Sequence, residues 1–274
     1  MRLPVMTQGL ARRLQQVLSI LSIASAKHAQ QEPGNPYGIV IQCFGDATAH
    51  LAQAISSVDW CNRVAGFDAE SASKLDDILN FFRTYSRRGN IDMDPTVFTP
   101  EISKLLTEKG LYPIPNGVVL YGLPEMHEES LPEGVQIQEV SKNEVDLVTQ
   151  LWADGFELSS RADSDAIMNL RKGSFLVPNN HLYVAYVDNT SVAMAALYIH
   201  DRIGYLNVGA TLPAFRKRGC HSALTARRIR DAAQAGCDLL MGYIGTFGSI
   251  SQNNMEREGM RIAYSVLTWV ERGV

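Results

Sequence analysis

The sequence has few cysteines and no long run of apolar residues. Its 274 residues include four cysteines, at positions 43, 61, 220 and 237, and none of them forms a C-x-x-C pair. This spacing argues against a disulfide framework and against a cysteine-based metal or redox motif. We therefore expect reduced thiols and a cytoplasmic protein. No uninterrupted apolar stretch reaches the roughly 18 residues that a membrane-spanning helix needs, so we expect no membrane association.

A strong excess of either charge is also missing. Lys and Arg number 25 against 29 for Asp and Glu, which gives a formal net charge of −4. Domains that bind nucleic acid usually carry a wide basic face, so we expect no nucleic-acid partner. His50, His127 and His181 show no metal-ligand spacing, and we expect no metal. The hydrophobic fraction of 46% is typical of a globular protein, and the length favours two small domains over one large one.

The N-terminal region can be interpreted in two ways. Arg12 and Arg13 precede an apolar stretch over residues 17–26, which weakly resembles a signal peptide. The alternative is an amphipathic helix, whose apolar stripe consists of Leu10, Leu14, Val17, Leu18 and Leu21. Because Gln15 and Gln16 interrupt the hydrophobic stretch, we favour the helix.

Hydrophobic periodicity and turn residues predict an α/β fold in two parts. Strands are expected at 38–44, 62–67, 90–94, 117–121, 135–140, 181–187, 192–199, 205–210, 238–244 and 260–270, and further helices at 73–87, 100–106, 143–156, 221–235 and 252–258. Asp188 and Asn189 predict a hairpin of strands 181–187 and 192–199, and Thr99 is the expected N-cap of helix 100–106. A strand, a crossover helix and a second strand imply a parallel pair near the C-terminus. We expect a twisted mixed sheet in each half, with domains at 1–123 and 135–274 and a linker at 124–134.

The two halves also share a short pattern. Residues 105–111 and 254–260 each place a charged helix end before a glycine, a hydrophobic residue and a strand. Helix–glycine–strand junctions are common, but the order of the preceding elements is also similar, so we favour a tandem repeat. A tandem arrangement can replace a dimer interface, and we expect either a monomer or a homodimer.

The most informative segment is the junction between a strand and a helix at 208–224. The strand is followed by a basic turn, Arg216, Lys217 and Arg218, and Gly219 then opens the helix. The amides and the dipole of a helix N-terminus bind anions, and a glycine lets a pyrophosphate approach the amides. The alternative is that these cations only form a solvent-exposed face of the helix and bind no ligand. The G-x-G-x-x-G and G-x-x-x-x-G-K-[ST] nucleotide motifs are absent.

This junction resembles the R/Q-x-x-G-x-G/A acyl-CoA signature of the GCN5-related N-acetyltransferase (GNAT) superfamily. Residues 216–221 match it, as do the flanking 211–213 and 222–224 and the final Gly259 and Met260. The resemblance covers 135–274 well and implies that the first half is a degenerate GNAT-like copy. It implies that acetyl-CoA, or another acyl-CoA, contacts Gly209, Ala210, Thr211, Arg216, Lys217, Arg218, Gly219, Cys220, His221, Ser222 and Asn254.

Two residues depart from the family pattern. His221 stands where most members have glycine or alanine, and Met255 stands where many have the tyrosine that protonates the leaving thiolate. A thioether cannot donate a proton. The acid is therefore left open among Tyr243, Tyr264, His221 and a water molecule, and the alternative is that the reaction needs no strong acid because the CoA thiol is already a fair leaving group. Weakly supported candidates for the base are Glu157, Asp163, His200 and Asp201. We expect the catalytic residues to include Tyr264, Tyr243 and His200.

The first half carries carboxylates where a phosphate loop is expected. Asp68 and Glu70 lie in the corresponding segment, 65–71, and would repel phosphate. We therefore expect only the second half to bind CoA. The resemblance implies an acyl-CoA-dependent N-acyltransferase in which an amine, not identified by the sequence, attacks the thioester directly. The alternatives are a CoA-binding pseudoenzyme and an acyl-CoA thioesterase or decarboxylase on the same fold.

Overall fold

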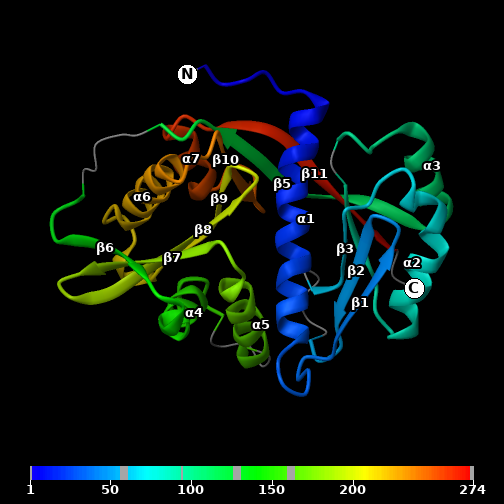
Figure 1. The fold of residues 1–274 in the computed structure, drawn as a ribbon, viewed down its shortest axis with the longest axis horizontal. Helices are drawn as coiled ribbons and strands as arrows, with labels where there is room; N and C mark the ends of the chain where they lie inside the picture. The colour runs from blue at the N-terminus through cyan, green and yellow to red at the C-terminus, as the bar shows by residue number, and fades with distance from the viewer. Residues whose placement is uncertain (1, 56–60, 94, 126–130, 159–163, 272–274) are drawn as a thin grey trace. The chain divides into compact units, whose positions relative to one another are not determined.

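The computed structural model describes residues 2–55, 61–93, 95–125, 131–158 and 164–271, and its backbone contacts divide the chain into two compact units. Unit 1 consists of Met1–Pro4 and Leu120–Ile262, and unit 2 of Val5–Val119 and Ala263–Val274 (Figure 1). Strands β5 (Leu111–Gly122) and β11 (Arg261–Glu271) each contribute residues to both units. None of the described helices is long and apolar enough to cross a membrane.

Unit 2 begins with a long amphipathic helix and continues as a small mixed sheet. Its elements are α1 (Gln8–Gln30), β1 (Ile39–Phe44), β2 (Ala47–Ala52), β3 (Arg63–Ala65), η2 (Ser71–Lys74), α2 (Leu75–Thr84), β4 (Asn90–Met93) and α3 (Pro100–Glu108). The strand order is β1-β2-β3-β4-β11, in which β3 and β4 are parallel and the other pairs antiparallel. The favoured N-terminal helix is confirmed, and its apolar residues at 14, 17 and 21 are buried.

Strand β2 was not predicted from the sequence. All six of its residues are buried, yet three of them are alanines, which have a low preference for strands. The strand forms because a tight turn after Phe44 folds it back on β1, with Phe44 paired to Ala47. The small alanine side chains of β2 allow the buried core of unit 2 to pack closely against the sheet. That core contains Leu51, Phe67, Leu75, Phe82 and Trp269.

Unit 1 contains the sheet that includes the 208–224 junction. Its elements are β6 (Val135–Val140), η3 (Lys142–Glu144), α4 (Val145–Gly155), α5 (Ser164–Leu176), β7 (Asn180–Val187), β8 (Thr190–His200), β9 (Ile203–Thr211), η4 (Pro213–Phe215), α6 (Cys220–Gln234), β10 (Leu239–Ile244) and α7 (Ile250–Arg257). The order is β10-β9-β8-β7-β6. The predicted hairpin of β7 and β8 and the parallel pair of β9 and β10 are confirmed.

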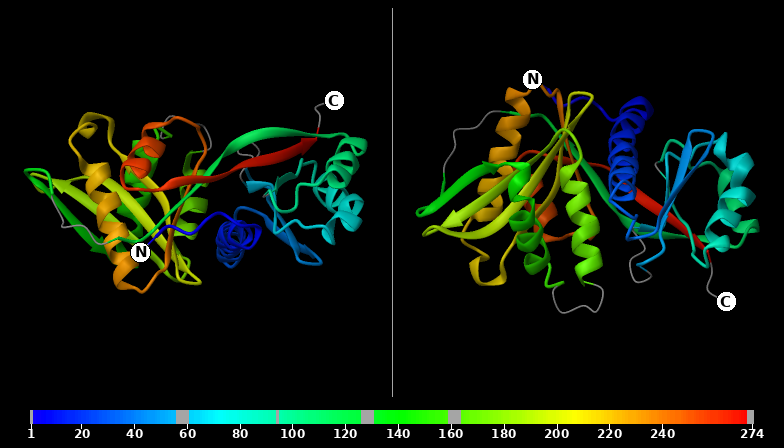
Figure 2. Two further views of the ribbon diagram at one scale, coloured as in Figure 1. Left: turned by 90° about the horizontal axis from the view of Figure 1, so that it is seen from above. Right: turned by 60° about the horizontal axis from the view of Figure 1, so that its bottom comes forward.

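Helices α4 and α6 cover opposite faces of this sheet (Figure 2). Successive residues of a strand point to opposite faces, and two neighbours on β9 show which helix covers each face. A Cβ atom at Gly209 would lie 3.6 Å from Nε2 of His221 on α6. Ala210 points the other way, and its Cβ would lie 2.8 Å from a Cβ at Gly155 of α4. The predicted α/β class with a mixed sheet flanked by helices is therefore confirmed.

The buried His50 of β2 predicts a pH-dependent stability. It is 6% exposed, its Nε2 lies 3.0 Å from Oγ of Ser22, and burial followed by the charge of Arg63 lowers its pKa to about 4. The unfolded chain binds a proton near pH 6.5, so the free energy of unfolding falls as the pH drops from about 6.5 towards 4, by up to about 3 kcal/mol. Urea unfolding across this range is expected to show a smaller loss for His50→Gln than for the wild type. An equal loss in both proteins would contradict the prediction.

Candidate functional site

Strands β9 and β10 separate towards their carboxyl ends. The pairing joins Ile203, Gly204 and Tyr205 to residues 239–241, and no further pair of these two strands is formed among the described residues. The remaining six residues of β9, 206–211, and residues 242–244 of β10 thus leave backbone groups available at the end of the sheet. In open α/β sheets the crevice beyond the carboxyl ends of parallel strands is the usual place for a ligand.

A bulge in β9 lies beside this opening. The register with β8 changes from Ala196↔Val208 to Tyr198↔Tyr205, so β9 has one residue more than its partner. The two glycines of β9 give independent support. Gly204 and Gly209 are an odd number of residues apart, yet a Cβ atom at either would meet α6, at Ala232 and at His221 respectively. The bulge therefore reverses which face of the sheet the side chains of the last residues of β9 point to, relative to the regular alternation from the first residues.

A buried arginine from α6 binds the backbone at the bulge. Arg228 is 1% exposed, and its Nη1 donates to the carbonyl oxygens of Ala196 at 3.2 Å and Val208 at 3.3 Å. Its Nε donates to the carbonyl of Leu224 at 3.1 Å, and its Nη2 to the hydroxyl of Thr225 at 3.3 Å. Burial lowers the pKa of Arg228 to about 10, so the side chain stays charged at neutral pH. A fixed positive charge therefore lies beneath the end of β9.

The turn before α6 has the conformation of an anion-binding loop. Lys217 and Gly219 have positive φ angles of 65° and 79°, and Gly219 is the N-cap of the helix. The first helical hydrogen bond joins the amide of Ala223 to the carbonyl of Gly219 at 2.9 Å. The amides of residues 220–222 therefore precede the helical ladder and point out of its end. A Cβ atom at position 219 would lie 2.6 Å from Cγ of Pro132, so glycine is required here.

The three cations of the turn have different surroundings. Arg216 ties the turn to α4, because its Nη2 donates to the carbonyl of Gly155 at 2.9 Å and to Oε1 of Glu157 at 3.3 Å. The guanidinium of Arg218 lies 5.5 Å from the ring centre of Phe215. Lys217 and Arg218 are both exposed. The cofactor contact that the sequence predicts for all three stays a prediction, and the structure gives Arg216 an additional role in holding the turn.

His221 and Asn254 meet at the N-terminus of α6. Nδ2 of Asn254, on α7, lies 3.2 Å from Nδ1 of His221. Burial, followed by the charge of Arg228, lowers the pKa of His221 to about 4. The imidazole is therefore neutral at physiological pH. The predicted contact residues Gly209, His221 and Asn254 come from three separate elements, and the structure brings them together.

Two neighbouring sulfur side chains are buried. Met255 is 3% exposed and packs on β10, where its Sδ would lie 2.6 Å from a Cβ atom at Gly242. Cys220 is 1% exposed, and burial raises the pKa of its thiol. A buried thiol with a raised pKa is a poor nucleophile. Neither residue therefore supplies a proton donor or a nucleophile to the opening between β9 and β10.

The other predicted catalytic residues lie apart from this cluster. His200 stacks on Tyr198 at the start of the turn into β9, so the length of β9 separates it from α6's N-terminus. Tyr264 belongs to unit 2, where its hydroxyl donates to Gln15 of α1 at 3.2 Å. Tyr243 follows Gly242 on β10 and therefore points away from the face on which Met255 packs. Of the candidate bases, Glu157 pairs with Arg216, and Asp163 lies outside the described residues.

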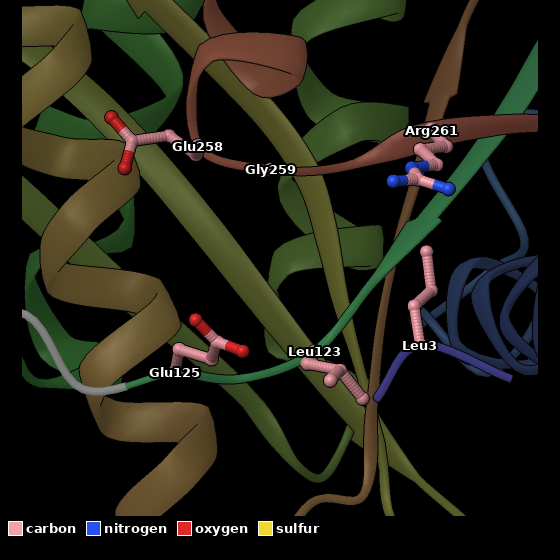
Figure 3. Close-up of a pocket in the computed structure, with 6 residues that line it drawn as sticks. All are labelled: Leu3, Leu123, Glu125, Glu258, Gly259 and Arg261. Atoms are coloured by element: carbon pink, nitrogen blue, oxygen red, sulfur yellow. The ribbon is translucent and has the colours of Figure 1, made fainter. Parts of the chain in front are cut away.

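A small cavity lies where α7 ends. It is lined by Leu3, Leu123, Glu125, Glu258, Gly259 and Arg261. Figure 3 shows the two carboxylates on one side of it and the guanidinium of Arg261 on the other. Its volume of about 120 Å³ is well below the 300–1,000 Å³ that is typical of ligand pockets. The cavity is therefore no candidate for the site of a large substrate.

In unit 2, a carboxylate caps segment 65–71, which the sequence analysis predicted to correspond to the turn before α6. Asp68 accepts hydrogen bonds from the amide of Ser71 at 2.8 Å and from its hydroxyl at 2.6 Å. Burial opposes ionisation of Asp68, but these bonds to Ser71 outweigh it and lower the pKa. The amide of Ser71 is thus occupied from within the chain, in contrast to the amides of α6.

Comparison with known proteins identifies the fold of this site. A family model described as "Acetyltransferase (GNAT) domain" matches residues 150–245. Residues 150–245 form a GNAT domain. The predicted resemblance is therefore confirmed for residues 150–245, which contain the bulge, Arg228, the basic turn and α6, whereas the degenerate GNAT-like first half stays a prediction. Asn254 and Met255, on α7, lie beyond the matched residues. No curated protein matches the sequence.

Solved structures extend the likeness beyond the GNAT domain. A GCN5-related N-acetyltransferase from Kribbella flavida has a TM-score of 0.61 and 20% identity, over 92% of this chain and 96% of its own. A tandem GNAT protein from the clavulanic acid biosynthesis pathway has a TM-score of 0.61 and 10% identity, over 95% of each chain. A GCN5-related N-acetyltransferase from Sphaerobacter thermophilus has a TM-score of 0.56 and 11% identity, over 94% and 93%. At these identities the likeness concerns the fold.

Proposed function

We propose that this protein is an N-acyltransferase that transfers an acetyl group from acetyl-CoA to an amine. The observation that carries the proposal is the N-terminus of α6, where the amides of residues 220–222 precede the helical ladder beside the opening between β9 and β10. A pyrophosphate is the kind of group that such amides bind, and Lys217 and Arg218 add exposed positive charge. The GNAT domain makes acyl-CoA the expected donor.

Backbone groups of β9 would hold the acyl-bearing end of the substrate. The residues after the bulge, Gly209, Ala210 and Thr211, lie on the strand edge that separates from β10, and an extended pantetheine arm can bind such an edge as an added strand. An amide from this edge would polarise the thioester carbonyl. We expect most of the rate enhancement to come from holding the amine and the thioester together.

We propose that only unit 1 binds acyl-CoA. The support is the contrast between the amides at the start of α6 and the amide of Ser71, which the carboxylate of Asp68 already binds. Isothermal titration with acetyl-CoA is therefore expected to give one site per chain. Two equivalent sites would contradict this assignment.

The transfer is tested by measuring thiol release from acetyl-CoA with a panel of amines. The panel should contain small amines, amino acids, aminoglycosides and peptide N-termini, with mass spectrometry of the products. Amine-dependent release with formation of an amide supports the proposal. Tight CoA binding without release across the panel favours a CoA-binding pseudoenzyme, and release without any amine favours a thioesterase or decarboxylase.

A proline at position 222 tests the role of the helix amides. Proline is tolerated in the first turn of a helix but has no N–H, so Ser222→Pro removes one amide while the helix is kept. We expect acetyl-CoA affinity to fall about 10-fold, which corresponds to about 1.4 kcal/mol. Ser222→Ala retains the amide and is the matched control, because residue 222 is exposed. Equal affinities of the two variants would contradict the role of the amide.

A further inference from the structure

We propose that Arg228 is a positioning residue for acyl-CoA, because it holds the carbonyl of Val208 in a direction that turns the backbone N–H of Gly209 into the opening between β9 and β10. This inference rests on the proposed binding of acyl-CoA in unit 1. It follows from three observations, which are the two carbonyls that one nitrogen of Arg228 binds, the weak strand pairing around Val208, and the burial of the guanidinium among uncharged acceptors.

The hydrogen bonds of a single Arg228 nitrogen fix the direction of the Val208 carbonyl. Nη1 donates to the carbonyl oxygen of Ala196 on β8 at 3.2 Å and to that of Val208 on β9 at 3.3 Å. Ala196 and Val208 are directly opposite each other in this antiparallel pair. Opposite residues direct their carbonyls either towards each other or away from each other, and one nitrogen can reach both oxygens only in the first case. The carbonyl of Val208 therefore points towards β8.

The N–H of Gly209 points the other way. In a trans peptide the C=O of one residue and the N–H of the next point in opposite directions, and the described part of the chain has no cis peptide bond. Because the carbonyl of Val208 points towards β8, the N–H of Gly209 points towards β10. Among the described residues these two strands pair only through 203–205 and 239–241, so this N–H lies at the opening.

The segment around Val208 has less support from neighbouring strands than the start of β9. The bulge at Leu206 and Asn207 interrupts the pairing with β8 just before Val208. On the other side, the described part of β10 forms no pair with β9 beyond Tyr205. A guanidinium that bridges β8 and β9 at this point therefore supplies a constraint that the strand pairing does not.

The burial of Arg228 is costly unless this bridge is needed. Arg228 is 1% exposed, and no carboxylate pairs with it in the part of the chain that the structure describes. Its remaining printed partners, the carbonyl of Leu224 and the hydroxyl of Thr225, are also uncharged and belong to its own helix. Taking a guanidinium out of water without an opposite charge destabilises a core. What the arginine provides here, and an apolar side chain would not, is the bond to both strands at the bulge.

A fixed N–H at Gly209 matters for a ligand that binds as an added strand. Such a ligand pairs with alternate residues of the edge, so Gly209 and Thr211 present their N–H groups to the same side. With the pyrophosphate at the amides of residues 220–222, the pantetheine arm would run along β9 from Thr211 towards Gly209. Arg228 thus acts on the part of the arm that lies deepest in the opening, and it does so through the backbone without touching the ligand.

Amide hydrogen exchange, measured by NMR on the full chain, tests the direction of the Gly209 N–H. The amide of Val208 is the internal control, because it points towards β8 and belongs to the ladder. In the free protein we expect Gly209 to exchange at least about 10-fold faster than Val208, and saturation with acetyl-CoA should slow the exchange of Gly209 about 10-fold. Equally slow exchange of both amides in the free wild type would overturn the inference, and this comparison needs no variant.

Arg228→Lys tests the bridge itself. Lysine keeps the positive charge but lacks the planar fork that binds several acceptors at once. In this variant, acetyl-CoA should slow the exchange of the Gly209 amide no more than about threefold. Isothermal titration should show an about 10-fold weaker affinity for acetyl-CoA, which corresponds to about 1.4 kcal/mol.

Ile229→Ala is the matched control for stability. Ile229 is the next residue of α6 and is 2% exposed, so its truncation leaves a cavity and destabilises the same helix without removing a hydrogen bond to the sheet. We expect its affinity for acetyl-CoA to stay within about twofold of the wild type, since the bulge keeps its bridge. If Ile229→Ala lost as much affinity as Arg228→Lys at a similar loss of stability, Arg228 would act only through the stability of the fold.

The outcomes separate this inference from the proposed function. If the wild-type protein does not bind acetyl-CoA, the proposed function itself is wrong, whereas the comparison of Gly209 with Val208 still shows where the N–H points. If the wild type binds acetyl-CoA, and Arg228→Lys has the same affinity and the same protection of Gly209, then Arg228 has no positioning role.

Discussion

Replacing Arg228 by methionine is expected to lower the free energy of unfolding by about 3 kcal/mol. Arg228 is 1% exposed, and its guanidinium donates to the carbonyls of Ala196, Val208 and Leu224. Methionine fills a similar volume but leaves buried carbonyl oxygens without a partner. Chemical denaturation measured by circular dichroism checks the value.

Arg227→Met is the matched control on the same helix. Arg227 lies next to Arg228 in the sequence but pairs with Asp231 nearer the surface, with side-chain exposures of 20% and 16%. The guanidinium of Arg227 also lies 5.6 Å from the ring centre of Tyr183, and we expect the loss of both contacts to cost about 1 kcal/mol, well below the loss in Arg228→Met. If the two variants lost equal stability, the carbonyls at the bulge would not depend on Arg228.

Replacing Gly219 by alanine is expected to weaken acetyl-CoA binding about 100-fold, or about 2.7 kcal/mol. The φ angle at this position is 79°, and a Cβ atom would lie 2.6 Å from Cγ of Pro132. The turn must therefore shift to admit the side chain, and the amides of residues 220–222 shift with it. Isothermal titration with acetyl-CoA measures the affinity.

Gly236, at the other end of α6, provides the control for backbone strain. Its φ angle is 75°, and a Cβ atom there would meet nothing within 4 Å. Gly236→Ala and Gly219→Ala should therefore share a strain of about 1 kcal/mol in stability, since alanine disfavours this region in both. Only Gly219→Ala should lose affinity. A similar loss in both variants would mean that helix stability, and not the shape of the turn, governs binding.

Local sequence signals were sufficient to predict the elements that are stabilised by residues close together in the chain. The apolar stripe of α1 predicted a helix, and the turn at Asp188 and Asn189 predicted the β7–β8 hairpin, where both residues have positive φ angles of 50° and 63°. The N-cap at Thr99 was also correct, and its hydroxyl accepts from the amide of Ile102 at 3.3 Å. In each case the signal and the hydrogen bonds involve residues close together in the chain.

Elements that depend on distant residues were missed. Helix α5, Ser164–Leu176, was not predicted, and it packs against α4. The pairing of β11 with β4, which joins Leu267 to Met93, also has no local signal. Strand patterning shows that a segment is a strand but not which strand it will pair with.

The side-chain contacts around the basic turn also could not be predicted from the sequence. The sequence indicated positive charge at 216–218 but gave no sign that Arg216 binds the carbonyl of Gly155, or that Arg228 is buried. An arginine on a helix is usually solvent-exposed, and no local pattern indicates the register change in β9, beside which Arg228 binds the carbonyls of Ala196 and Val208.

The sequence by itself determined the α/β class and the glycine turn at the start of α6, because helix periodicity, turn residues and a glycine with positive φ are local properties of the chain. The tertiary structure decided which side chains meet at that turn. His221 faces Gly209 and receives a hydrogen bond from Asn254, 33 residues away, only because α6 and α7 pack on the same face of the sheet. Such contacts depend on strand order and on the bulge, and these are set by the packing of the whole unit.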